Sequence, residues 1–215
     1  MKRKILFTFI LFSMANLHIF AFSADFFANI GLISSLNTYK NSAPSPIMFS
    51  LGGGTNIKFT PLFSFSPQLQ FFTNYWLYDE NENYIFPAEI EHRTALALNC
   101  LVDLPIIFNF YARKSTFSAG VGLAFLLRYG FLSQGVTQSE QEDIKKINSL
   151  FYEKCNFLLP SVSFAWLYEL NNGWKAGPEI KALLSLGGLL HENSPSPLQN
   201  SMLSVAFKIE FPKFK

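Results

Sequence analysis

The strongest structural constraint in the sequence is a period-two alternation that runs through Ala95–Phe131. Even positions from Leu96 to Phe110 are apolar, whereas the odd positions of that segment include Asn and Asp residues. After a polar turn at Arg113–Ser115 the alternation resumes over Thr116–Phe131, with large apolar side chains on one face and mainly Gly, Ala and Ser on the other. Because successive side chains of a strand point to opposite faces, this stretch predicts one long β-hairpin. Its strands would far exceed the usual length of about five or six residues.

The residue types on the second face indicate which kind of β-protein this is. A soluble barrel turns apolar side chains inward and exposes many charges. Here the second face is small or polar, which suits the narrow interior of a small transmembrane barrel whose outer face meets lipid. Periodicity alone does not separate the two, so a secreted soluble β-barrel remains the alternative.

The first residues are typical of a secretory signal peptide. Met1–Lys4 is basic and Ile5–Phe22 is an apolar run followed by small residues, so we expect cleavage after Ser23, with Ala21 or Ala24 as rival sites. An uncleaved anchor helix is the other interpretation. The predicted organisation is therefore a signal peptide over residues 1–23 and an outer-membrane β-barrel over residues 24–215. No Cys follows the apolar run closely enough to suggest a lipid anchor.

Composition narrows the class of membrane protein. Without Lys2, Arg3 and Lys4 the 17 basic residues fall to 14, against 15 acidic ones, so we expect no nucleic-acid partner. Charged residues make up 15% of the chain, compared with about 25% in ordinary soluble domains, and aromatic residues 17%. After the predicted signal, no apolar run reaches the roughly 18 residues that a spanning helix needs. An exported chain of this kind can cross a membrane as a closed β-barrel.

Reading the alternation along the whole chain predicts eight antiparallel strands in an up-and-down transmembrane β-barrel. The long connections 37–46, 79–88, 132–154 and 187–200 alternate with short ones, which is typical of outer-membrane barrels with extracellular loops and short periplasmic turns. The acidic start and basic end of Ser139–Asn148 predict a short helix in the third extracellular loop. The eight predicted strands are Asp25–Leu36, Ile47–Phe59, Leu62–Tyr78, Glu89–Tyr111, Thr116–Phe131, Cys155–Leu170, Trp174–Leu186 and Ser201–Phe211.

The two cysteines are predicted to be free thiols. Cys100 falls on the apolar face of one strand and Cys155 near the start of a strand two positions away in the barrel order. Their Cα atoms should therefore be too far apart for a disulfide.

Two segments resemble the small eight-stranded outer-membrane proteins, in particular the OmpW-like and OmpX-like groups. They are LPIIFNFY at residues 104–111 and FSAGVGL at residues 117–123, a Leu-Pro strand followed by a Gly-rich strand. The alternation of Phe207, Ile209 and Phe211 resembles the C-terminal assembly signal of such barrels, although the chain continues through Pro212–Lys215. The resemblance implies location in the outer membrane, contact with its lipids, and insertion by the barrel-assembly machinery.

Ten charged side chains are predicted to face the barrel interior. They could line a polar channel, or they could form a salt-bridged plug, which we favour because an eight-stranded interior is only just wide enough for side chains. The predicted lumen-lining residues are Lys58, Arg93, Asp103, Arg128, Glu169, Lys175, Glu179, Lys181, Lys208 and Glu210.

A route through the wall is a further hypothesis. OmpW-like proteins are thought to pass small hydrophobic molecules in this way, and the resemblance implies the same idea here. Pro67 and Pro105 would interrupt the hydrogen-bonded ladder where a lateral opening could form, although such prolines are more often simple bulges.

No residue pattern indicates catalysis. Beyond the predicted signal the only histidines are His92, which has no Ser at strand spacing, and His191, which falls in a predicted loop beside Glu192, so we expect no enzyme. No group of His, Cys or carboxylate residues has ligand spacing, so we expect no metal and no cofactor.

The sequence thus predicts a monomeric outer-membrane β-barrel that serves as a narrow channel for passive passage of small hydrophobic molecules. The alternative is a surface-exposed adhesin or structural barrel with a closed interior, which binds a host surface ligand or a partner through its extracellular loops. Tyr39, Tyr84–Phe86 and Leu150–Tyr152 could be contact residues of such loops, or part of the aromatic girdle at the membrane interface.

Overall fold

The computed structural model describes residues 23–36, 47–80, 83–88, 94–131, 138–186 and 198–211, and most of them belong to antiparallel strands. The strands are β1 (Ser23–Ser35), β2 (Ile47–Lys58), β3 (Phe63–Phe65), β4 (Gln68–Asp79), β5 (Tyr84–Ala88), β6 (Ala95–Asp103), β7 (Ile106–Ala112), β8 (Ser115–Phe131), β9 (Leu158–Glu169), β10 (Lys175–Leu183) and β11 (Met202–Glu210). The helices are α2 (Gln138–Leu150) and a 3₁₀ turn at Glu153–Cys155.

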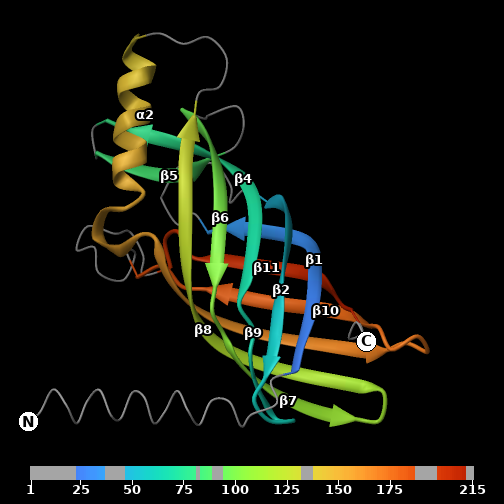
Figure 1. Cartoon of the computed structure of the whole chain (residues 1–215). Coiled ribbons are helices and arrows are strands. Elements are labelled where there is room, and N and C mark those ends of the chain that lie inside the picture. Colours follow the sequence, from blue (N-terminus) through green and yellow to red (C-terminus); the bar gives the residue numbers. More distant parts are fainter. Residues whose placement is uncertain are drawn as a thin grey trace, which may run out of the picture.

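The strands close into a ring, because the first strand pairs with the last (Figure 1). Two of the strands are interrupted: β3 and β4 follow one line of the wall, and so do β6 and β7. Counted in this way, the described residues form eight strands around the ring, each paired antiparallel with its neighbours in sequence. The predicted up-and-down fold is therefore confirmed.

The two interruptions lie at Pro67 and Pro105, where the sequence predicts irregular pairing. Proline has no N–H to donate, so the ladder loses a hydrogen-bond donor at each of these two residues. The wall nevertheless stays hydrogen-bonded at both places. The carbonyl of Pro67 accepts from the N–H of Thr55 (3.0 Å), and the carbonyl of Pro105 accepts from the N–H of Ser66 (3.0 Å).

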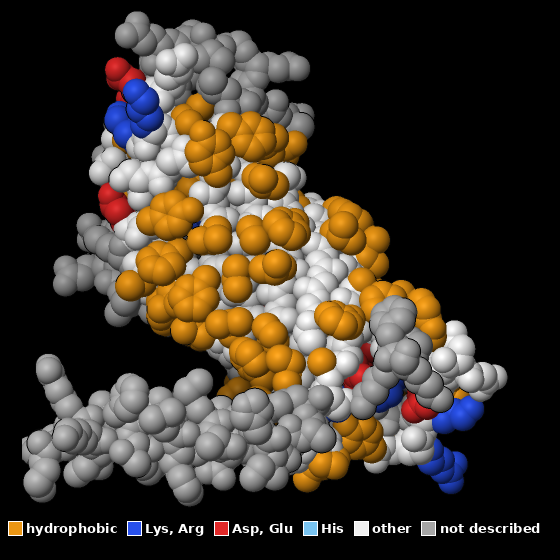
Figure 2. Space-filling view, viewed as in Figure 1, with side chains coloured by type: hydrophobic (Ala, Val, Ile, Leu, Met, Phe, Trp, Pro, Cys, Tyr) orange, Lys and Arg blue, Asp and Glu red, His pale blue; other side chains and the backbone are white. Residues whose placement is uncertain are grey.

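The outer face of the ring is apolar and the inner face is small or polar. Large hydrophobic side chains of every wall strand are exposed on the outside, among them Phe26, Leu51, Leu98, Phe164 and Phe207. Figure 2 shows them as a broad belt across the strands, with charged side chains at the two ends. A belt of this kind on a closed barrel is a lipid-facing surface.

The long connection predicted over residues 79–88 contains a strand, β5, so this part of the prediction is wrong. β4 continues to Asp79 and folds back, so that Tyr84 pairs with Asp79 and Ala88 with Tyr75. Ile85 and Phe86 are buried (2% and 5% exposed), which removes them as contact residues of a loop. Aromatic and β-branched residues favour pairing on a half-buried sheet, and the extension of β4 offers them a partner.

Helix α2, at the end of the barrel away from the short turns, confirms the predicted helix. We call this end the helix end and the opposite one the turn end. β8 pairs with β9 only as far as Phe125, so the backbone of its last residues lacks a strand on that side. Side chains at the end of α2 supply the missing partners. The Tyr152 hydroxyl accepts from the N–H of Arg128 (3.0 Å) and donates to its carbonyl (2.8 Å), and Asn148 bonds both backbone groups of Gly130.

Two residues near this helix do not lie where the sequence predicts them. Cys155 lies in the 3₁₀ turn rather than at the start of a strand, and Phe151 is fully buried against Trp76. Among the described residues, no helix is long and apolar enough to cross a membrane.

Candidate functional site: the barrel interior and its wall

A buried ion pair occupies the middle of the interior. The ammonium of Lys181, on β10, lies 2.7 Å from a carboxylate oxygen of Asp103, on β6, and both side chains are almost fully buried. The Asp103 carboxylate also accepts hydrogen bonds from Gln68 (3.0 Å) and Ser161 (2.8 Å). Because β10 and β6 are not neighbours in the ring, this pair ties distant parts of the wall together.

Two further pairs lie toward the turn end. Lys58 bonds to Asp25 across the β1–β2 pair, and Lys208 lies 3.5 Å from Glu179. Glu210 accepts from the amide of Asn56 (3.4 Å). Six of the ten residues predicted to face the interior thus belong to one polar, hydrogen-bonded or ion-paired filling: Lys58, Asp103, Glu179, Lys181, Lys208 and Glu210.

The other four predicted residues lie elsewhere. Glu169 is exposed at the end of β9, and Lys175 is half-buried, with its ammonium 3.5 Å from the hydroxyl of Thr116. Arg128 is buried near the helix end (4% exposed) and takes no part in the polar filling. Arg93 lies outside the described residues.

Above the polar filling, the interior becomes apolar on several strands at the same level. Inward residues change from Asn29 to Ile33 on β1, from Gln70 to Phe72 on β4 and from Lys181 to Leu183 on β10. The resulting buried cluster comprises Ile33, Met48, Phe72, Leu101, Ala124, Leu126, Leu159, Leu183 and Met202. An eight-stranded ring has room for about this many side chains and little else. In the described part of the chain, the interior is packed with side chains over both of these layers.

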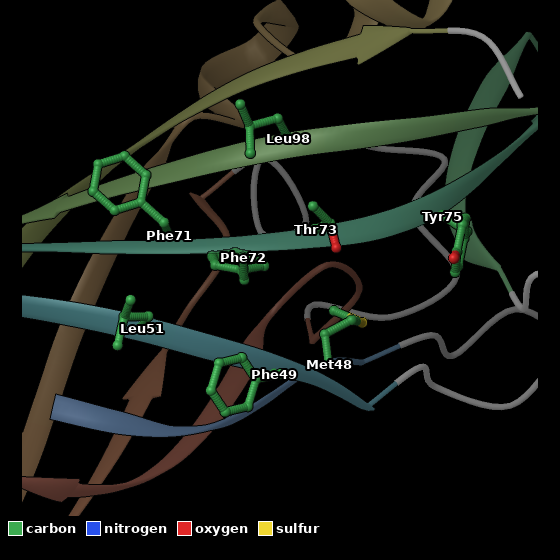
Figure 3. Close-up of a pocket in the computed structure, with 8 residues that line it drawn as sticks. All are labelled: Met48, Phe49, Leu51, Phe71, Phe72, Thr73, Tyr75 and Leu98. Carbon is green, nitrogen blue, oxygen red and sulfur yellow. The ribbon is translucent and has the colours of Figure 1, made fainter.

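A pocket of about 380 Å³ opens in the wall beside this apolar layer (Figure 3). β2 and β4 pair only between Ser50–Gly54 and Gln68–Phe72, and they separate toward the helix end. The lining residues come from three strands, and all but Thr73 are apolar or aromatic: Met48, Phe49, Leu51, Phe71, Phe72, Thr73, Tyr75 and Leu98.

The pocket connects two environments. Phe49, Leu51, Phe71 and Leu98 belong to the exposed, lipid-facing belt, whereas Met48 and Phe72 are buried members of the apolar layer. A small apolar molecule dissolved in the lipid would therefore meet an apolar surface that leads from the outside of the wall to the edge of the core. Neither Pro67 nor Pro105 lines this pocket.

Sequence reasoning missed the pocket because it depends on where two strands stop pairing. Alternation assigns each side chain to a face, but it does not show that β4 leaves β2 to pair with β5. One available signal was the segment Tyr84–Phe86, two aromatic residues around a β-branched Ile85, whose composition favours a strand.

Comparison with known proteins supports the fold. No family model and no curated protein matches the sequence. The crystal structure of Neisserial surface protein A (NspA) matches with a TM-score of 0.55 and 8% identity over 88% of this chain and 97% of that one. The Yersinia pestis attachment invasion locus protein Ail, solved with the heparin analogue sucrose octasulfate, matches with a TM-score of 0.43 and 6% identity over 87% and 97% of the two chains.

The outer-membrane enzyme PagL also matches, with a TM-score of 0.41 and 10% identity over 86% of this chain and 99% of that one. The expectation that the chain is not an enzyme is corrected on this finding, because barrels of this architecture include an enzyme. We therefore withdraw the exclusion of catalysis.

These three matches are all under 25% identical, so they concern the fold alone. Of the three, the NspA match is the one that supports a shared fold, with a TM-score of 0.55. It agrees with the closed antiparallel ring and with the apolar belt on its outside. The chain has the fold of the small eight-stranded outer-membrane β-barrels and is a protein of the outer membrane.

Proposed function

We propose that this outer-membrane barrel takes up small apolar molecules through its wall, at the pocket between β2 and β4. The observation that carries the proposal is the pocket of about 380 Å³ lined by both lipid-facing and core residues. Ligand pockets are usually concave and mainly apolar, and this one falls within the usual size range.

The filled interior supports a lateral route over an axial one. Lys181 and Asp103 are joined across the interior, and the apolar layer lies above them. Water and ions would have to displace both layers to pass along the axis, whereas an apolar solute reaches Met48 and Phe72, at the edge of the apolar layer, directly from the lipid-facing side of the pocket.

The test is uptake of the apolar fluorescent dye 1-N-phenylnaphthylamine by intact cells that carry the barrel in their outer membrane. Thr73→Trp would fill the pocket, and Leu203→Trp places the same ring on a lipid-facing position of β11 outside it. We expect uptake above that of cells without the protein, a return toward that level with Thr73→Trp, and no change with Leu203→Trp. Equal uptake with and without folded wild-type protein would contradict the proposal.

A second function, binding of a host surface ligand or partner at the helix end, is supported by α2. The helix is held on the barrel by Tyr152 and Asn148, and the side chains of Glu142, Lys145 and Lys146 are exposed on it. Loops and helices held on a rigid scaffold commonly carry recognition. If Lys145→Glu with Lys146→Glu lowers attachment of cells to a host-cell layer while dye uptake is unchanged, this function gains support.

We also propose that residues 1–23 are a cleaved signal peptide, that the barrel-assembly machinery inserts the chain, and that the barrel is monomeric. N-terminal sequencing of the membrane-inserted protein tests the first of these, with Ala24 expected as the first residue.

A further inference from the structure

Among the described residues, Arg128 is a buried cation that has no acidic partner. Its side chain is 4% exposed, and it belongs to none of the four ion pairs found among the described residues. Its guanidinium lies 5.0 Å from the ring centre of Trp76 and 5.3 Å from that of Phe151. These aromatic faces attract the charge, but they accept no conventional hydrogen bond from it.

Two of the three guanidinium nitrogens, Nε and Nη2, are buried and have no hydrogen-bond partner in the described part of the chain. These two nitrogens form one edge of the planar group, and their N–H bonds point in nearly the same direction. That edge matches the spacing of two oxygens of a phosphate or carboxylate, which is why arginine binds such groups in a bidentate way.

The neighbouring polar groups add a further unused donor. Asn99 is the cross-strand partner of Arg128, and its amide donates to Asn74 (2.9 Å), which also accepts from the Trp76 indole (2.7 Å). The amide nitrogen of Asn74 itself is buried without a partner among the described residues. A buried donor left unpaired is unfavourable, and a buried charge more so.

We propose that Arg128 is the centre of a binding site for a phosphate group at the helix end of the barrel. A water molecule could accept one hydrogen bond here, but a phosphate would accept from both edge nitrogens and also neutralise the charge. In an outer membrane such a group can come from a lipid headgroup or from free phosphate. Phe151, whose ring lies 5.3 Å from the guanidinium, and Tyr152, which bonds to the Arg128 backbone, would border the bound group.

The experiment uses the native fluorescence of Trp76, which stacks on the guanidinium. The other two tryptophans, Trp166 and Trp174, lie in the exposed belt and are replaced by Phe in the reporter protein. The refolded chain, in micelles of a non-ionic maltoside detergent, is titrated with inorganic phosphate. A parallel titration uses micelles doped with phosphatidic acid, with phosphatidylcholine as the control lipid.

We expect a saturable change of Trp76 fluorescence with at least one of these probes. A response to phosphate alone identifies the free ion, and a response to phosphatidic acid alone identifies a headgroup. Arg128→Lys keeps the charge but loses the bidentate edge, so we expect binding weaker by about tenfold or more. Lys114→Met removes an exposed cation at the turn end, the opposite end of the barrel, and should leave binding unchanged.

Two results would overturn the site. One is a folded reporter protein that responds to neither probe, and the other is equal binding by the wild type and Arg128→Lys. If Arg128→Lys does not fold, the test instead follows the ¹⁵N chemical shift of the Arg128 Nε in the wild-type protein during the same titrations. No shift of that resonance at saturating phosphate or phosphatidic acid would then refute the proposal.

Discussion

Replacing Lys181 with Met would leave the Asp103 carboxylate buried without its cation. The ion pair is 2.7 Å long and its two side chains are 2% and 1% exposed, so bulk water does little to stabilise the carboxylate once the ammonium is removed. Removing one partner of a buried pair costs about 3–5 kcal/mol. Gln68 and Ser161 would still donate to the carboxylate, which places our expectation near the lower limit, at about 3 kcal/mol. That loss corresponds to a roughly hundredfold change in the folding equilibrium.

The assay is reversible unfolding in guanidinium chloride, with folded barrel measured by its heat-modifiable migration on gels. Lys146→Met is the matched control, because it removes a pair with Asp143 that is 3.8 Å long and half exposed. Such surface pairs contribute less than about 1 kcal/mol. The double variant Asp103→Asn with Lys181→Met leaves no buried charge, so we expect it to recover much of the lost stability. The reasoning is refuted if Lys181→Met costs no more than Lys146→Met.

Three more outcomes follow from the structure. The refolded barrel should show no single-channel steps in a planar bilayer, since both interior layers are packed; regular steps would contradict this. Tyr152→Phe removes the hydroxyl that bonds the Arg128 backbone and should speed exchange of that amide, whereas Tyr168→Phe, in the exposed belt, should not. Gly177→Ala should lower the folding yield sharply, because the added Cβ would overlap a backbone carbonyl of β9. The control is Gly130→Ala, whose Cβ would meet no atom closer than 3.6 Å, and equal yields of the two variants would refute the packing argument.

Much of the fold could be predicted because each wall strand has one face toward the lipid and one toward the interior, and its residue types alternate accordingly. Asn99, Leu101 and Asp103 are all buried, whereas the residues between them are only partly buried, as the alternation of Ala95–Phe131 requires. The helix predicted over Ser139–Asn148 is found at Gln138–Leu150; its acidic residues lie in its N-terminal half, where the helix dipole favours them, but its last turn contains no basic residue. These signals are local, and they do not depend on which other strand lies beside them.

The rest depends on partners that are distant in sequence. The pocket exists because β4 parts from β2, and within the described part of the chain Arg128 belongs to no ion pair. Alternation places Arg128 inside, together with nine other charges, but it does not show which charges meet. The pairing of Lys181 with Asp103 is likewise set by the order of the strands around the ring and by their register.

β8 has 17 residues and β9 has 12, and this difference affects whether one barrel could pair with another. Beyond Phe125, the outer edge of β8 carries backbone groups that another extended chain could pair with, and exposed edges of this kind promote aggregation. At Arg128 and Gly130 those backbone groups are already hydrogen-bonded to the side chains of Tyr152 and Asn148. The segment that carries these two side chains is not a strand, so it cannot extend the sheet further. Helix α2 therefore protects neighbouring barrels from joining edge to edge, whatever else the helix end of the protein binds.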